Sequence, residues 1–196
     1  IGLLISGVTV ANSMIEQAKY RKIISEIGEI ERSVKIFKAA YDALPGDFDK
    51  AYNYWGDECG GNSYSEAGCN GNNDGLISTP TPSERYRFWQ HLKLAGIIDG
   101  VFTGVVHSGS RYNSLDNSFP SAATRAYYYV WSGVQTGYWV VNNYNVHPYH
   151  NLHLNNATES TWGWLEASDA PFTVEETRLL DMKFDDGAPL TGNMFS

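Results

Sequence analysis

The sequence predicts an α+β fold in which one long N-terminal helix packs on an antiparallel β-sheet, with short flanking helices and long loops. Three observations predict it. The first 43 residues contain no proline and place apolar side chains at helical spacing. Two helix-start signatures open shorter segments further along the chain. Residues 127–131 and 138–144 are rich in aromatic and β-branched residues, which is typical of strands, and residues 132–137 would join them as a hairpin.

We expect the N-terminal helix to cover residues 1–43 and to have two parts. Residues 1–15 carry no charge, whereas residues 16–43 are amphipathic. In the second part, apolar side chains recur every three or four positions and form one stripe. These residues are Ile23, Ile27, Ile30, Val34, Phe37 and Tyr41. Pro45 ends the helix because proline disfavours helical geometry in the residue before it.

The length of this helix separates it from the rest of the chain. At 1.5 Å per residue it is about 65 Å long. Residues 44–196, if compact, form a globular head about 40 Å across. The head therefore cannot cover the helix, and the apolar end needs a membrane or other copies of the chain. The uncharged run is shorter than the roughly 20 residues that span a bilayer.

The stretch IGLLISGVTVANSMIEQAKYRKIISEIGEIERSVKIFKAAYDALPGDF resembles the N-terminal helix of type IV pilins and type II secretion pseudopilins. Two later stretches, ERYRFWQHLKLAGIIDGVFTG and DMKFDDGAPLTG, resemble bacterial prepilin-type proteins that carry an ALPGD segment. The resemblance implies a pilin-like fold, a cleaved leader and N-terminal methylation. The chain shows no leader, phenylalanine start or early glutamate, so we expect Ile1 to lie well inside a mature pilin.

The long helix and this resemblance favour a structural subunit of an extracellular type IV pilus-like filament on the bacterial cell surface. We expect the chain to pass through the inner membrane and then to assemble with other copies of itself. Small residues at four-residue spacing in the first helix let helices approach closely. The expected filament core consists of Ile1, Gly2, Leu3, Leu4, Ile5, Gly7, Val8, Val10, Ala11 and Met14.

Other functions are also compatible with this sequence. A minor pseudopilin of a type II secretion or DNA-uptake machine would use the same helix at a filament tip. An adhesin would bind a glycan or a partner through Trp131, Trp139, Trp162 and Trp164, although packing is the favoured role of these side chains. The net charge of −8 argues against nucleic acid as a partner. We expect no enzymatic activity, because no nucleophile elbow, phosphate loop or acid–base pair is present.

The two cysteines, Cys59 and Cys69, lie in a polar, glycine-rich stretch of residues 45–80 that we interpret as a loop region. We favour a disulfide over free thiols, because a bond between them would close a short loop in an oxidising compartment. A zinc site would need two further ligands, and no neighbouring histidine offers one.

Residues 70–77 have the spacing of a calcium-binding loop, with a glycine at the sixth position where the chain must turn sharply. The expected ligands are the side chains of Asn70, Asn72 and Asp74 and the backbone carbonyl of Leu76, with Glu84 as a late ligand. Calcium would be the chain's one cofactor. The alternative is an Asn-Gly turn that needs no ion, and both interpretations stay open.

Two capping boxes predict short helices over residues 82–95 and 173–183. We interpret His91 as a surface residue of the first. The chain from 105 to 125 is predicted to be a loop. At the end of the second helix and just beyond it lie Asp181, Asp185 and Asp186, three carboxylates within six residues. For these we favour a turn capped by aspartate side chains over an ion site.

Three histidines, His147, His150 and His153, have a spacing that would gather a metal ion only in a helix. Pro148 argues against a helix there. We therefore interpret this segment as a surface loop.

Overall fold

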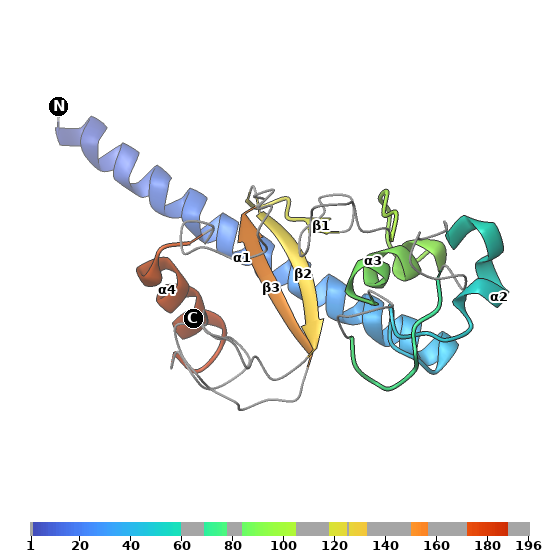
Figure 1. Cartoon of the computed structure of the whole chain (residues 1–196). Helices are drawn as coiled ribbons and strands as arrows, with labels where there is room; N and C mark the ends of the chain where they lie inside the picture. The colour runs from blue at the N-terminus through green and yellow to red at the C-terminus, as the bar shows by residue number, and fades with distance from the viewer. Residues whose placement is uncertain are drawn as a thin grey trace.

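The computed structural model describes residues 2–59, 69–77, 84–104, 118–124, 126–132, 150–156 and 172–187. Its architecture is α+β, as predicted. The elements in chain order are α1 (Gly2–Tyr41), α2 (Ala51–Trp55), the 3₁₀ helix η1 (Gly56–Cys59), α3 (Glu84–Leu94), β1 (Phe119–Pro120), β2 (Ala126–Ser132), β3 (His150–Asn156) and α4 (Val174–Phe184). Figure 1 shows α1 extending along the whole molecule, with its N-terminal end standing clear of the head.

Helix α1 ends at Tyr41, two residues before the predicted end. The reason is local, because Asp42 adopts the left-handed conformation, with φ 54°, and so stops the helical repeat. The predicted apolar stripe is confirmed. Ile23, Ile30 and Phe37 are buried, and the other three members are half-buried. The amphipathic part of α1 is therefore the spine on which the head is built.

The core joins α1 to α3 and to the sheet. Its members include Ile30 and Phe37 of α1, Phe88, Trp89 and Leu92 of α3, and Tyr128 and Val130 of β2. Helix α3 is enclosed so completely that residues 84–92 are all buried. Its predicted capping residues, Thr81 to Ser83, lie outside the described residues.

The sheet is antiparallel with the strand order β1-β2-β3. Tyr128 of β2 pairs with Leu154 of β3 on one side and with Phe119 of β1 on the other. The predicted strand 138–144 and the turn that leads to it lie outside the described residues. The predicted surface loop is wrong for residues 150–153, because they belong to β3. One face of β2 is buried, and its backbone needs a neighbouring strand. Residues 150–153 are part of that strand because their backbone pairs with β2.

The predicted loop region 45–80 also needs correction, because it contains α2 and η1. Within the predicted loop 105–125, residues 119 and 120 form β1. The capping box at Thr173 is confirmed, since the amide of Glu176 donates to the Thr173 hydroxyl and the Glu176 carboxylate accepts from the Thr173 amide. Helix α4 therefore starts where the sequence predicts.

Candidate functional site

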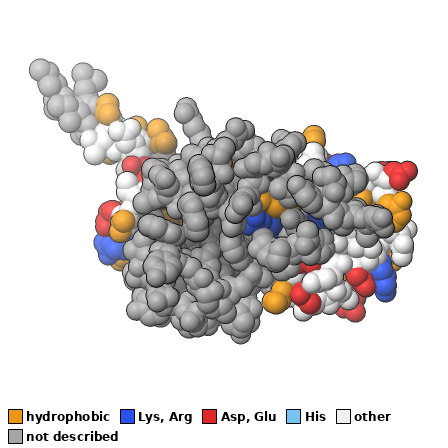
Figure 2. All heavy atoms as spheres, viewed as in Figure 1, with side chains coloured by type: hydrophobic (Ala, Val, Ile, Leu, Met, Phe, Trp, Pro, Cys, Tyr) orange, Lys and Arg blue, Asp and Glu red, His pale blue; other side chains and the backbone are white. Residues whose placement is uncertain are grey.

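The first candidate site is the apolar segment, which we define as residues 7–15 of α1. Every residue of this segment is exposed. Its large apolar side chains have exposed fractions of 61% for Val8, 60% for Val10, 67% for Met14 and 67% for Ile15. Figure 2 shows apolar side chains on the part of this helix that projects from the head. The head therefore leaves this surface uncovered.

Small residues make the apolar segment accessible to another helix. A Cβ atom added at Gly7 would meet no atom within 4 Å, and Ala11 lies one turn further along the same face. Of the expected core residues, Ile1 lies outside the described chain, and the side chains at positions 2–5 are not described. Across the described residues, no helix combines the length and apolarity that crossing a membrane requires.

The head begins to cover α1 at Lys19. The Lys19 ammonium lies 3.6 Å from the Glu176 carboxylate and 4.5 Å from the centre of the Phe172 ring. The neighbouring Tyr20 is buried, with its ring 6.5 Å from that of Phe172. The residues at the start of α4 therefore mark the boundary between the projecting and the covered parts of α1.

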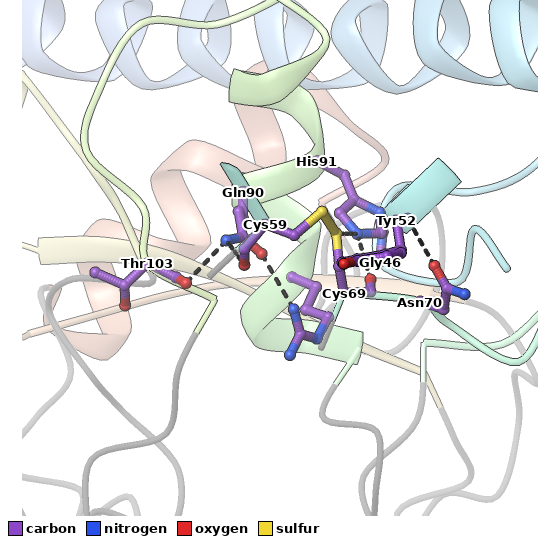
Figure 3. The surroundings of a disulfide bond; sticks show 9 residues. Gly46, Tyr52, Cys59, Cys69, Asn70, Gln90, His91 and Thr103 are labelled. Carbon is purple, nitrogen blue, oxygen red and sulfur yellow. Dashed lines mark hydrogen bonds between the residues drawn. A yellow bond between two sulfur atoms is a disulfide. The ribbon is translucent and has the colours of Figure 1, made fainter. Parts of the chain in front are cut away.

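The second candidate site is the loop system beside α3, which is held by a disulfide between Cys59 and Cys69. Their Cα atoms are 5.3 Å apart and both residues are buried. The disulfide prediction is confirmed. Gln90 of α3 donates one hydrogen bond to the Cys59 carbonyl at 2.6 Å and another to the Thr103 carbonyl at 2.9 Å. The disulfide and α3 are thus connected in one hydrogen-bonded unit (Figure 3).

His91 lies at the centre of this unit, and the prediction that it is a surface residue is wrong. Its side chain is fully buried and stacks on Phe37 at a ring distance of 6.1 Å. The Nδ1 atom accepts a hydrogen bond from the Gly46 amide, and the Nε2–H group donates to the Cys69 carbonyl, each at 2.9 Å. These two bonds define the tautomer and connect the chain after α1 to the disulfide loop (Figure 3).

Burial determines the charge of His91. Desolvation, aided by the positive charge of Arg87, lowers the pKa of the imidazole to about 3, although the bond to Cys69 acts in the opposite direction. The neutral ring is the form that accepts from Gly46 and donates to Cys69. His91 is therefore a structural connector at neutral pH.

The turn that brings the Gly46 amide to His91 requires glycine at position 46. Its φ is +86°, and a Cβ atom added there would collide with the backbone carbonyl of Glu84. Only a residue without a side chain lets the turn after α1 approach the start of α3 this closely.

The predicted calcium loop forms an acidic cluster, but with a different set of residues. Asp47, Asp74 and Glu84 each place a carboxylate oxygen within 4.8 Å of the others. Asp47 was not among the ligands predicted from the sequence, because it lies 27 residues before Asp74 in the chain. Desolvation raises the pKa of Asp47, which the amides of Gly75 and Asp74 partly offset.

Backbone groups already hold this cluster in shape. Both oxygens of Asp47 accept amide hydrogen bonds, from Asp74 at 3.1 Å and from Gly75 at 2.9 Å. The amide of Asn72 donates to Glu84 at 3.0 Å, and Asp74 accepts from the amide of Leu76 at 2.9 Å. These are the contacts of a hydrogen-bonded turn, and calcium binding at this loop stays a prediction.

Two of the predicted ligands have other roles. The side-chain oxygen of Asn70 accepts from the amide of Tyr52 at 2.8 Å, which satisfies an otherwise unpaired donor near the start of α2. The side chain of Asn72 contacts Asp74 at 2.9 Å. The structure therefore brings Asp74 and Glu84 together and turns Asn70 towards α2.

One sequence signal for His91 was available. Positions 88, 91, 92 and 95 have the spacing of a single helix face, and apolar residues occupy the other three of them. A histidine within such a face is a candidate for burial. Asp47 had no comparable local signal, since its partners lie in a distant loop.

No protein-family model, curated protein or solved structure matches this chain.

Proposed function

We propose that the chain is a structural subunit of an extracellular type IV pilus-like filament, assembled through the N-terminal part of α1. The observation that carries the proposal is the apolar segment, a continuous exposed surface on a helix that projects from a folded head. Its resemblance to a pilin helix agrees with this use. Before assembly, the same surface would lie in the inner membrane.

The free energy gained by covering the apolar segment favours contacts with many neighbouring subunits over contact with a single one. Covering Val8, Val10, Met14 and Ile15 would stabilise an assembly by roughly 1–2 kcal/mol for each side chain. The sum of roughly 4–8 kcal/mol only reaches the lower part of the cost of association, which is about 4–15 kcal/mol. Stable assembly therefore needs contacts with several copies. A repeated, non-closing interface between copies produces an open filament.

The head supports this role because it is cross-linked and packed around the covered part of α1. The disulfide, the buried His91 and the core between α1 and α3 hold the covered half of α1 firmly. A subunit built in this way presents its polar head outwards and its apolar segment to its neighbours. A minor pseudopilin would use the same helix at a filament tip, so labelling along the filament distinguishes the two roles.

The test compares the same substitution at two exposed valines. In the full-length protein, Val10→Arg places a charge on the apolar segment, and Val101→Arg places one on the head, where the side chain is 84% exposed. We expect Val10→Arg to abolish filaments in electron microscopy and Val101→Arg to leave them intact. Circular dichroism should show both heads folded. Normal filaments from Val10→Arg would contradict the proposal, as would wild-type protein that stays monomeric in water without detergent.

A further inference from the structure

The end of α4 carries a second acidic cluster, formed by Asp181, Asp185 and Asp186. One carboxylate oxygen from each residue lies within 4.8 Å of the other two. Asp181 belongs to the last turns of α4, and the amide of Asp185 donates to its backbone carbonyl at 2.8 Å. The chain then turns at Gly187, with φ 77°. The three carboxylates are therefore brought together by the end of one helix.

Asp181 distinguishes this cluster from an ordinary capped turn. Its side chain has an exposed fraction of 0%, and neither carboxylate oxygen has a hydrogen-bond partner within the part of the chain that the structure describes. A buried carboxylate without a partner is strongly unfavourable. In the acidic cluster at Asp47, by contrast, backbone amides satisfy the carboxylate. The turn favoured from sequence leaves Asp181 unexplained.

The position of Asp181 near the C-terminal end of α4 makes its buried charge still less favourable. The C-terminal end of a helix carries a partial negative charge and carbonyl groups that lack intrahelical donors. Three carboxylates gathered there repel one another and the helix end. A cation beside Asp181 would offset all of these contributions at once.

From this arrangement we infer that Asp181, Asp185 and Asp186 bind a calcium ion. The donors are all oxygen atoms, which hard cations prefer, and no cysteine or histidine is among them. Two oxygens on opposite sides of a bound ion lie up to about 5 Å apart for Ca²⁺ and about 4.2 Å apart for Mg²⁺. The three carboxylate oxygens lie within 4.8 Å of one another, so one calcium ion can contact all of them. Calcium also accepts irregular sets of oxygen ligands, whereas Mg²⁺ demands near-ideal octahedral geometry and gives up its water reluctantly, so the cluster favours calcium. This inference does not depend on the filament proposal.

The consequence for the molecule is a fixed C-terminal end of α4. The same helix begins at the contact of Glu176 with Lys19, where the head starts to cover α1. A calcium ion at its other end would stabilise α4 as a whole. We therefore expect calcium to raise the melting temperature of the protein.

The experiment is calorimetric titration of CaCl₂ into the full-length, EDTA-treated protein in detergent. Asp181→Asn removes the buried charge with little change in shape, and Asp186→Asn removes the charge of an exposed carboxylate. We expect each to weaken calcium binding at one site about tenfold or more. Asp74→Asn, the matched control in the other cluster, should leave this site unchanged.

Two further measurements complete the test. Calcium should raise the melting temperature of the wild-type protein, and the increase should be smaller in Asp186→Asn even if Asp181→Asn fails to fold. Titration with MgCl₂ should show weaker binding than CaCl₂. Wild-type protein that binds no calcium, or an Asp186→Asn variant that binds it as the wild type does, would overturn the inference. Loss of the binding in Asp74→Asn alone would also overturn it.

Discussion

The carboxylate of Glu26, in the middle of α1, accepts a hydrogen bond from the hydroxyl of Tyr128 in β2 at 2.9 Å. The same carboxylate accepts from the Ser121 hydroxyl at 2.7 Å and from the Ala122 amide at 2.9 Å. Glu26 is buried, with an exposed fraction of 3%. Three donors compensate for its desolvation. Burial and the bond to Glu26 raise the pKa of Tyr128, so its hydroxyl stays protonated.

Tyr128→Phe should therefore destabilise the head. The substitution removes one of three donors from a buried carboxylate, and hydrogen bonds to charged groups contribute about 2 kcal/mol. Urea denaturation should show a loss of that size in the free energy of unfolding. Tyr127→Phe is the control, because Tyr127 occupies the opposite face of β2. If the two substitutions reduced the free energy of unfolding equally, the bond to Glu26 would not be a specific source of stability.

Glu26 also shows what the sequence could predict and what it could not. The stripe of α1 was predictable because apolar residues recur at helical spacing. The partners of Glu26 lie 95 to 102 residues away, and no local pattern connects them. Strand β3 was missed because its sequence, HNLHLNN, is rich in asparagine and histidine, whose strand propensity is low or neutral. Its pairing with β2 overrides that preference.

The candidate sites also contain parts that the sequence could predict and parts that it could not. The disulfide was predictable, because the chain has two cysteines at a short spacing. The acidic loop was found through its pattern, yet Asp47 enters it from a turn that only the close approach of Gly46 to α3 makes possible. The burial of Asp181 depends on what covers α4, which a single sequence does not reveal.

His91 should make the stability of the head depend on pH. Its pKa is about 3 in the folded protein against 6.5 for an unperturbed imidazole. The unfolded chain therefore takes up a proton that the folded chain does not between these values. The stabilising contribution is complete above pH 6.5 and is lost as the pH falls towards 3, with a slope of up to about 1.4 kcal/mol per pH unit.

Between pH 7 and pH 5 this contribution should fall by about 2 kcal/mol. His91→Gln provides the comparison, because glutamine does not titrate. It should be less stable than the wild type at pH 7, since it disturbs the bonds to Gly46 and Cys69. The difference between the two proteins should narrow by about 2 kcal/mol at pH 5. A constant difference in denaturation experiments at both pH values would contradict the burial of a neutral ring.

The disulfide should stabilise the protein by restricting the conformations of the unfolded chain. It joins residues ten positions apart, and closing a loop of that length stabilises a protein by about 3 kcal/mol. Cys59→Ala combined with Cys69→Ala should reduce the free energy of unfolding by that amount. Peptide mass spectrometry without reduction should recover the two cysteines linked. Two alkylatable thiols in freshly isolated protein would show that the bond does not form.

The last prediction separates close packing from apolarity in the assembly of the apolar segment. A Cβ atom added at Gly7 meets no atom within 4 Å beyond the neighbouring backbone of its own helix, so we expect substitutions there to leave the fold of the subunit intact. Gly7→Leu makes the segment more apolar but prevents another helix from approaching at Gly7 and Ala11. If small residues set the distance between helices, Gly7→Leu should reduce the filament yield strongly, and Gly7→Ala should retain most of it. Sedimentation and electron microscopy of both variants measure the yield. Filaments from Gly7→Leu as abundant as those of the wild type would show that apolarity alone holds the subunits together.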